Sequence, residues 1–582
     1  MNFILALYKK LARLTQKQTV MPPEVTMSEP TRRPLPLILI RGFGGLDVSD
    51  EKKDTYQRFN VGTVYPQKQG ENYIYEGLIL RFMKSNWQYQ DATNIVGYYG
   101  KPYTYEPLLP DKLKRSKDQA IVEKFMRLKE LGYFSGDKVI IDPGMALHLL
   151  ETVKNPWQTL WVFRYYDLDD RKFDVYGKAL VRLIDFIQEL TSQLEGGKPK
   201  VNIIAHSMGG LIVREAIQRT YPQKGQRAEE YINKIVTLGT PHQGISFQIL
   251  QHWINISAAE EIEHFNPDFQ KEPKNEAAFV NFPKYFPVER LLTVVGTNYR
   301  SYDSAIASEL NRLFPLAGEY GSNYNRSDGL VKQTSAQIPG APRTFVNKCH
   351  GGNDSLITSR EAFEIATRFF FGNVRARLRF INGKVTRGKD FFGKSEFFLG
   401  VSIKPRRVDF DLFHQSKEAE NCYGPFSSVD PQDQNIDFRE TNDKLAFPWA
   451  DNNKLIWEGY LDTTPIIQDE SITPKDLVLR LDFYVGERDL YGIGFSDNVI
   501  FRKQYYLRAL LPTNEQPQPV FYLHTDERFA IEGFQPSDTD KMQKVNGGWE
   551  FEVVGTGFQG TFRIEVDEVP EIGQAKPFLD MT

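Results

Sequence analysis

The stretch VNIIAHSMGG, residues 201–210, decides the fold of this chain. A short apolar run ends at Ala205, a helical pattern begins just past Ser207, and the small residues Ala205 and Gly209 stand two positions to either side of the serine. A sharp strand–turn–helix connection needs small residues there, because the turn brings both sides of the backbone close together. The pattern therefore predicts a buried strand, a tight turn carrying the serine, and a helix whose first N–H groups favour negative charge.

Residues 201–210 resemble the nucleophile elbow of α/β-hydrolase lipases and esterases, with Ala205 where the commoner pattern has glycine. The resemblance implies that Ser207 is a catalytic nucleophile. The loop GTPHQG, residues 239–244, is similar to the loop that follows this unit in lipases and in GPI-inositol deacylase-like enzymes. The alternative is an ordinary buried strand and helix with a chance Ser-x-Gly, so the other motifs must decide.

A second motif lies near the start of the chain. The apolar run Leu37–Ile40 predicts a strand buried on both faces of a parallel sheet, and RGFGG follows it at residues 41–45. Lipases commonly carry His-Gly-x-x-Gly at this point, so the resemblance implies an oxyanion hole made by the backbone N–H groups of Phe43 and Met208. Arg41 replaces the usual histidine, whose side chain is not itself a donor.

The acid of a serine triad is expected after the predicted strand Leu291–Gly296. Ser-Asp-Gly at residues 327–329 resembles the acid loop of lipases, which makes Asp328 the predicted acid. Asp303 and Asp354 are the alternatives.

The base is expected at the end of the last strand of the sheet. Residues 344–346 form the predicted strand, and His350 follows as the predicted base. The order Ser207, Asp328, His350 is the order of α/β-hydrolases. His242 stands too early in this order, so it is interpreted as a pocket-lining or structural residue.

The length of 582 residues favours two domains. The resemblance covers about residues 37–372, which predicts an α/β-hydrolase domain with a mostly parallel sheet. Insertions at about 46–158 and 245–290 are predicted to form a cap or lid at the active-site edge. A cap that never moves is the alternative for the second insertion.

Residues 373–582 follow a different periodicity. Apolar and polar residues alternate at 374–380 and again at 477–485, which is typical of antiparallel strands with one buried face. Many such strands with turn residues between them predict a β-sandwich domain. Residues 414–453 are polar and are predicted to form a loop.

The N-terminal segment, residues 1–36, combines an amphipathic helical pattern at 1–20 with a proline-rich linker at 20–36. The basic, amphipathic pattern predicts either contact with a membrane surface or a helix docked on the protein. The C-terminal domain is a second candidate for peripheral membrane contact. No segment is long and apolar enough to predict a transmembrane helix.

Charge and cysteine content indicate which partners, cellular location and cofactors to expect. The net charge is −3 with both signs interspersed, so no nucleic-acid partner is expected. Cys349 and Cys422 are far apart, which predicts no disulfide framework and favours a reducing, cytoplasmic location with possible membrane association. Ester hydrolysis by a serine nucleophile needs no cofactor or metal. Acidic loops at 389–396 and 487–497 faintly resemble calcium-binding loops, but solvated loop charges are the simpler interpretation.

The motifs together predict a serine hydrolase that cleaves carboxylic ester bonds, in lipids or other esters, through an acyl-enzyme on Ser207. One alternative is an acyltransferase similar to lecithin:cholesterol acyltransferase, which would use the same residues and pass the acyl group to a lipid alcohol. An alternative of another class is a non-catalytic binding protein on a hydrolase fold.

Overall fold

The structure of the chain is a computed structural model. It describes residues 34–42, 76–93, 95, 113, 118–135, 141–163, 172–192, 197–244, 264–265, 279–299, 327–351, 354–386, 395–416, 419, 421–426, 435–437, 455–471, 473–489, 499–512 and 518–569. Residues 1–20, Phe43, Asp303 and most of both predicted insertions lie outside this set. Among the described residues no helix is apolar over a length that could cross a bilayer.

The first domain is built on a seven-stranded sheet in the order β2-β3-β1-β4-β5-β6-β7, and all six pairings are parallel. Its inner strands are mostly apolar, as expected for strands that are buried on both faces. The strands are β1 (Leu37–Ile40), β2 (Gln90–Asp91), β3 (Thr159–Phe163), β4 (Val201–His206), β5 (Ile232–Leu238), β6 (Leu291–Gly296) and β7 (Arg343–Val346). Strand β2 lies inside the predicted insertion 46–158, so part of that segment extends the sheet.

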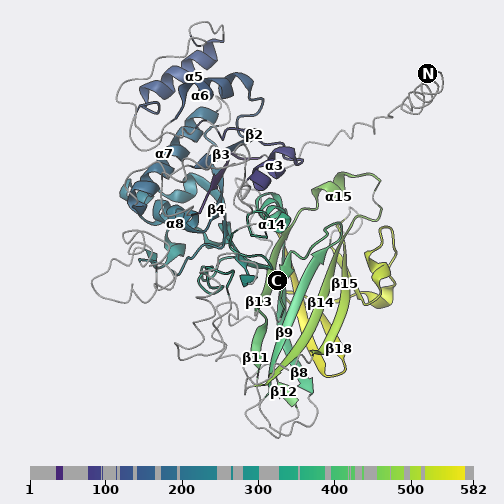
Figure 1. Ribbon diagram of the computed structural model, residues 1–582. Helices are drawn as coiled ribbons and strands as arrows, with labels where there is room; N and C mark the ends of the chain where they lie inside the picture. Colours follow the sequence, from purple (N-terminus) through teal and green to yellow (C-terminus); the bar gives the residue numbers. More distant parts are fainter. Residues whose placement is uncertain are drawn as a thin grey trace, which may run out of the picture.

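Helices cover both faces of this sheet (Figure 1). One face shares a buried apolar core with α5 (Gln119–Glu130), α6 (Pro143–Thr152), α7 (Phe173–Thr191) and α8 (Met208–Glu215). The other face packs against α3 (Glu76–Lys84) and α14 (Arg360–Phe371). Shorter helical segments are η2 (Ala216–Thr220), α9 (Tyr221–Gln223), η3 (Ala228–Glu230), η5 (Phe282–Lys284) and η6 (Val288–Arg290).

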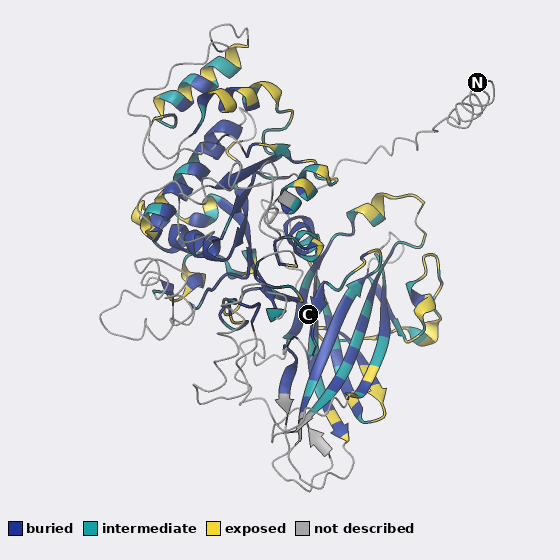
Figure 2. Cartoon of the chain, in the orientation of Figure 1, coloured by how far each residue is buried: buried dark blue, intermediate teal, exposed yellow. Residues whose placement is uncertain are grey.

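The second domain consists of two antiparallel sheets that share one apolar core (Figures 1 and 2). One sheet has the order β10-β9-β14-β15-β16, with β11 also paired to β9; the other has the order β12-β8-β19-β18-β17, with β13 also paired to β8. Inward-facing residues of the long strands alternate with polar ones, so burial creates the two-layer arrangement. The predicted parallel domain followed by an antiparallel sandwich is confirmed.

The strands of the sandwich are β8 (Val374–Thr386), β9 (Ser395–Pro405), β10 (Phe413–His414), β11 (Tyr423–Phe426), β12 (Asn435–Asp437), β13 (Leu455–Leu461), β14 (Asp476–Asp489), β15 (Val499–Leu510), β16 (Val520–His524), β17 (Gln543–Val545), β18 (Gly548–Gly555) and β19 (Phe558–Glu568). Helical segments are α15 (Thr464–Gln468), η10 (Glu527–Ala530) and η11 (Asp538–Asp540). The prediction of a loop at 414–453 is wrong in part. Strands β11 and β12 lie there and pair with β9 and β8, because backbone pairing does not require an apolar sequence.

The two domains meet along the edge strand β7. The rings of Phe345 on β7 and Phe413 on β10 lie 5.8 Å apart, and the Thr344 hydroxyl donates to the carbonyl of Leu412 at 3.0 Å. Val295 and Phe345 of the first domain belong to the same buried core as the sandwich residues. The sandwich therefore covers an edge that would otherwise be open to unwanted pairing.

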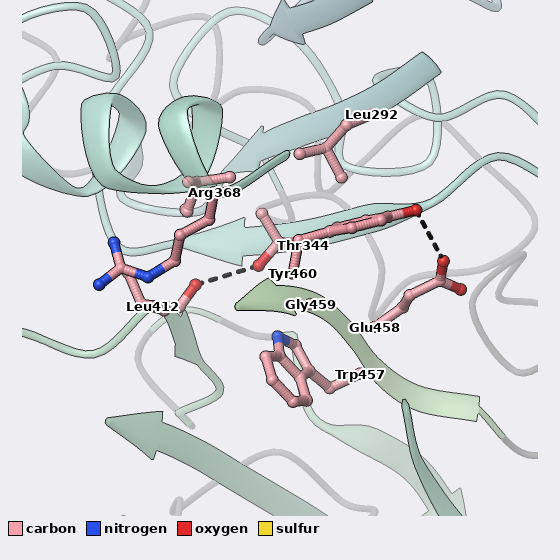
Figure 3. A pocket seen from close by; sticks show the side chains of 9 residues that line it. Leu292, Thr344, Arg368, Leu412, Trp457, Glu458, Gly459 and Tyr460 are labelled. Atoms are coloured by element: carbon pink, nitrogen blue, oxygen red, sulfur yellow. Dashed lines mark hydrogen bonds between the residues drawn. The ribbon is translucent and has the colours of Figure 1, made fainter. Parts of the chain in front are cut away.

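A narrow pocket lies along this interface (Figure 3). It has an empty volume of about 300 Å³, open solvent included, and none of the residues predicted as catalytic lines it. Within it the Tyr460 hydroxyl donates to the buried carboxylate of Glu458 at 3.3 Å. The lining residues are Leu292, Thr344, Ile365, Arg368, Leu412, Trp457, Glu458, Gly459 and Tyr460.

Candidate active site

Ser207 occupies the turn between β4 and α8. Its backbone has φ 52° and ψ −127°, a conformation that costs a residue with a side chain on the order of 1–3 kcal/mol. The backbone N–H of Ser207 donates to the carbonyl of Leu238 on the neighbouring strand at 2.9 Å, which holds the turn in the sheet. The serine lies at the carboxyl end of the central strand and directly precedes a helix N-terminus, as the sequence predicts.

Glycines allow this turn to be tight. A Cβ on Gly209 would lie 2.7 Å from the carbonyl oxygen of Arg41 and 2.8 Å from that of Ile40, so α8 passes directly against the end of β1. A Cβ on Gly210 would lie 2.2 Å from the Thr240 hydroxyl oxygen. Both approaches are closer than real Cβ atoms show, which explains the Gly-Gly pair after the serine.

Ser207, His350 and Asp328 form one chain of hydrogen bonds. Nε2 of His350 lies 2.9 Å from Oγ of Ser207, and Nδ1 of His350 lies 2.8 Å from Oδ2 of Asp328. All three are buried, with exposed fractions of 6%, 4% and 1% respectively. Since an ionised carboxylate only accepts, Nδ1 carries the proton and Nε2 presents its lone pair to the serine hydroxyl.

The loop around Asp328 fixes its carboxylate. Oδ1 accepts the backbone N–H groups of Leu330 at 3.1 Å and Val331 at 2.7 Å, which leaves Oδ2 for the histidine. The alternative acid Asp354 instead pairs with Lys348 at 2.7 Å and is half-exposed. The alternative Asp303 lies outside the described residues.

His206, directly before the serine, makes a contact that sequence reasoning missed. Its Nε2 lies 3.0 Å from the backbone carbonyl of His350, and the two rings are 4.8 Å apart between centroids. Burial lowers the pKa of His206 well below its usual range, and the nearby His350 acts in the same direction. A neutral His206 therefore donates to this carbonyl, which holds the backbone of His350 beside the serine turn.

His242 has the structural role that the sequence suggests. It is buried, its Nε2 lies 3.0 Å from the Thr237 hydroxyl, and it is not part of the Ser207 hydrogen-bond chain. Burial lowers its pKa well below the usual range, and the charge of Arg214 adds to this effect. The side chain is therefore neutral when the protein is folded.

Arg214 on α8 is a second residue that sequence reasoning missed. Its guanidinium is buried and donates to the backbone carbonyls of His242 and Phe279 and, at 2.9 Å, to the side chain of Gln218. The group also lies over the rings of Phe265 and Phe279, at 5.0 Å and 5.8 Å from their centroids. One side chain on the helix after the serine thus holds both ends of the stretch 243–278.

Of the two predicted oxyanion donors, Met208 and Phe43, the structure describes Met208. Met208 is the first residue of α8 and is buried, and its amide is one of the N–H groups at a helix start that have no partner within the helix. A Cβ on Gly42 would lie 2.7 Å from Cβ of Ser207, so the loop after β1 passes beside the serine. Phe43 itself lies outside the described residues. The described part of the chain contains no group of three His, Cys, Asp or Glu side chains that could hold a metal ion.

Part of the first domain matches a known protein family. Residues 133–284 match the family model described as "PGAP1-like alpha/beta domain". The first domain has an α/β-hydrolase-like fold. The predicted resemblance to the α/β-hydrolase lipases and esterases is confirmed, and comparison with curated proteins finds no match.

Solved structures similar to the α/β-hydrolase chain include the mature lipase BlEst2 of Bacillus licheniformis (14% identity, 58% of this chain and 92% of that one, TM-score 0.27). A gene product of Listeria innocua is similar at 12% identity, over 58% of this chain and 94% of that one, with a TM-score of 0.27. Phospholipase PlaB of Legionella pneumophila is similar at 12% identity, over 69% of this chain and 88% of that one, with a TM-score of 0.23.

Proposed function

We propose that this protein is a serine hydrolase that cleaves carboxylic ester bonds, with lipid esters as its substrates. The observation that carries the proposal is the buried chain from Ser207 through His350 to Asp328, with contacts of 2.9 Å and 2.8 Å. Such a chain converts a weakly nucleophilic hydroxyl into one that can attack a carbonyl. The sequence resemblance to lipases supports lipid esters as the substrate class.

The first half of the reaction forms an acyl-enzyme. Oγ of Ser207 attacks the ester carbonyl carbon while Nε2 of His350 accepts the hydroxyl proton, and Asp328 stabilises the imidazolium through Nδ1. The negative carbonyl oxygen is stabilised by the amide of Met208 and, by the sequence resemblance, that of Phe43. The intermediate collapses when His350 donates its proton to the leaving alcohol. In the second half water attacks the acyl group by the same steps, which releases the acid and restores Ser207.

Labelling with a fluorophosphonate probe tests the nucleophile. We expect the wild type to be labelled and Ser207→Ala to lose both labelling and ester hydrolysis. Ser402 in the sandwich is a matched control, because it too is buried and its hydroxyl lies 3.1 Å from a histidine nitrogen, Nδ1 of His414. Asp411 contacts that same nitrogen at 3.2 Å, so this cluster cannot relay a proton between two nitrogens, and Ser402→Ala should label as the wild type does. An unlabelled wild type, folded by circular dichroism, would refute the proposal.

A panel of esters of graded chain length, offered dissolved and as an emulsion, tests the substrate class. A lipid hydrolase should prefer long acyl chains and emulsified substrate. A sharp preference for short, dissolved esters would reject lipid substrates while retaining ester hydrolysis. Adding a lipid alcohol to the same assay measures transfer of the acyl group against release of free acid.

We further propose that the protein is cytoplasmic and contacts membranes peripherally. The amphipathic, basic sequence of residues 1–20 supports the membrane contact, because such a face binds anionic lipid surfaces. The test is co-sedimentation with anionic vesicles of the full chain and of a chain that lacks residues 1–20. Binding lost with the segment supports the proposal for that segment, binding retained would assign it to the rest of the chain, and no binding by either contradicts it.

A further inference from the structure

The loop that carries Asp328 has two sides with different partners. On one side, the Asp328 carboxylate meets His350. On the other side, Val331 and Ala336 are buried to 1% and 2% exposure in the core that also contains the inward-facing residues of the β-sandwich. The loop therefore lies between the candidate active site and the second domain.

Val331 connects these two sides within a single residue. Its backbone N–H donates to Oδ1 of Asp328 at 2.7 Å, and its carbonyl accepts the N–H of Asp328 at 3.2 Å. Its side chain belongs to the shared core. Any displacement of Val331 in the core thus moves a donor of the Asp328 carboxylate.

A buried hydrogen bond attaches the same loop to the sandwich. Nε2 of Gln333, which is 3% exposed, donates to the backbone carbonyl of Ala419 at 3.0 Å. The loop also continues toward the active site, because the backbone N–H of Gln243 donates to the carbonyl of Ser335 at 3.1 Å. Gln333 therefore makes a buried polar contact between the loop and the sandwich.

The strand that precedes His350 contacts the same part of the sandwich. Ala419 lies in the segment 412–419, which also contacts Thr344 and Phe345 of β7 through Leu412 and Phe413. Strand β7 leads to His350 only a few residues later. One segment of the second domain thus supports both the strand before the base and the loop of the acid.

We propose that the β-sandwich positions the catalytic acid, through segment 412–419, with Gln333 as the positioning residue. This inference rests on the proposed serine hydrolase function. It assigns the second domain a part in the rate of the chemical step, beyond any role in binding lipid or partners. The main effect of losing the contact should therefore be on kcat, since the group affected acts in the transition state and not in substrate binding.

The decisive variant is Gln333→Met, which keeps the length of the side chain and removes the donor. Gln188→Met is the matched control, because Gln188 on α7 is 4% exposed and donates in the same way to the carbonyl of Pro199 at 2.9 Å. We expect Q333M to lower kcat about tenfold with KM changed by less than about twofold, and Q188M to leave both within about twofold. Thermal unfolding of both full-length variants measures how much stability each variant loses with its hydrogen bond.

A double-mutant cycle with Asp328→Asn separates positioning from a general structural effect. If Gln333 acts through Asp328, Q333M should change the residual activity of D328N by less than about twofold. An equal loss in both backgrounds, or equal effects of Q333M and Q188M, would overturn the inference. If Q333M does not fold, Gln333→Asn shortens the side chain, and the same comparisons apply. A wild type without ester hydrolysis would instead refute the proposed function.

Discussion

The backbone N–H of His350 donates to the backbone carbonyl of Asp328 at 2.8 Å, while Nδ1 of His350 lies 2.8 Å from Oδ2 of Asp328. The two loops are thus joined through the main chain as well as through the side chains. The main-chain bond holds the loops in register when the side-chain bond is altered. Substitutions at Asp328 should therefore report on the tautomer of the imidazole and not on a rearranged site.

Asp328→Asn should lower kcat by roughly 10³-fold or more while leaving the fold intact. The asparagine oxygen can still accept the N–H groups of Leu330 and Val331, so its NH₂ group then faces Nδ1 of His350. The histidine would accept there and carry its proton on Nε2, where it can no longer accept the serine proton. Hydrolysis of an activated ester measures this, with circular dichroism as the check on folding. A loss of less than about tenfold would assign the acid role elsewhere.

Gly209→Ala should disturb the serine turn. The new methyl group would meet the carbonyl oxygens of Arg41 and Ile40 within 2.8 Å, and these residues lie just before Phe43, the predicted oxyanion donor. We expect kcat to fall by about tenfold or more as the helix moves away from β1. Gly77→Ala is the control, because its Cβ would have only the end of Arg81, at 3.4 Å, as a close neighbour. Equal activity of the two variants would contradict the close approach of α8 to β1.

The protein should become less stable as the pH decreases, because His242 is neutral in the folded state. The unfolded chain takes up a proton near pH 6.5, whereas burial and Arg214 hold the pKa of folded His242 well below that value. The unfolded state thus binds more protons below that pH, and each pH unit of decrease costs about 1.4 kcal/mol of unfolding free energy per such histidine. Full stability is present above about pH 6.5 and is lost as the pH falls.

Urea unfolding at about pH 7.5 and about pH 5.5 measures this loss, in the wild type and in His242→Gln. The variant should lose less stability between the two pH values, although it is less stable at both. His148→Gln, at an exposed position on α6, is the control. An identical pH dependence of H242Q and the wild type would show that this histidine does not contribute.

Arg214→Met should lower both stability and catalytic efficiency. It leaves the buried carbonyls of His242 and Phe279 without their donor, which costs roughly 2 kcal/mol or more. We also expect kcat/KM to fall about tenfold, because one of these carbonyls precedes the predicted cap at 245–290 and the other lies within it, and both are held by the helix that follows Ser207.

Arg182→Met is the matched control for Arg214→Met. Arg182 also bridges two backbone carbonyls, those of Gly132 and Ser135 at 2.6 Å and 3.0 Å, and lies over the ring of Tyr133. This variant should lower the melting temperature and leave kcat/KM within about twofold. Equal effects of both variants on kcat/KM would contradict a specific role for Arg214.

The central part of the fold could be predicted because its signals are local. The apolar run before Ser207, the small residues around it and the helical pattern after it lie within a few residues, so the sequence predicts the turn directly. The sandwich was predictable for the same reason, since alternation along each strand reports its buried face. Chain order then pointed to Asp328 and His350, which the structure brings to the serine. The oxyanion role of Phe43 stays a prediction.

The contacts that support the site could not be predicted, because each depends on partners far away in the chain. Nothing next to His206 or Arg214 indicates that they reach the carbonyls of His350 and Phe279. The sequence predicts a loop at 414–453 because the strands there are short and lack a clear alternation, yet these strands pair with longer ones. Polar side chains that bond to a distant backbone leave no periodic pattern in a sequence.

The left-handed backbone of Ser207 has a consequence for how this protein could change over time. Glycine adopts this conformation without strain, so the proposed nucleophile stands at a position where the chain would fold better with another residue. A laboratory selection for heat resistance alone would favour that replacement and, on the proposed function, would yield a more stable but inactive protein. Retention of serine under such selection requires that turnover be selected at the same time.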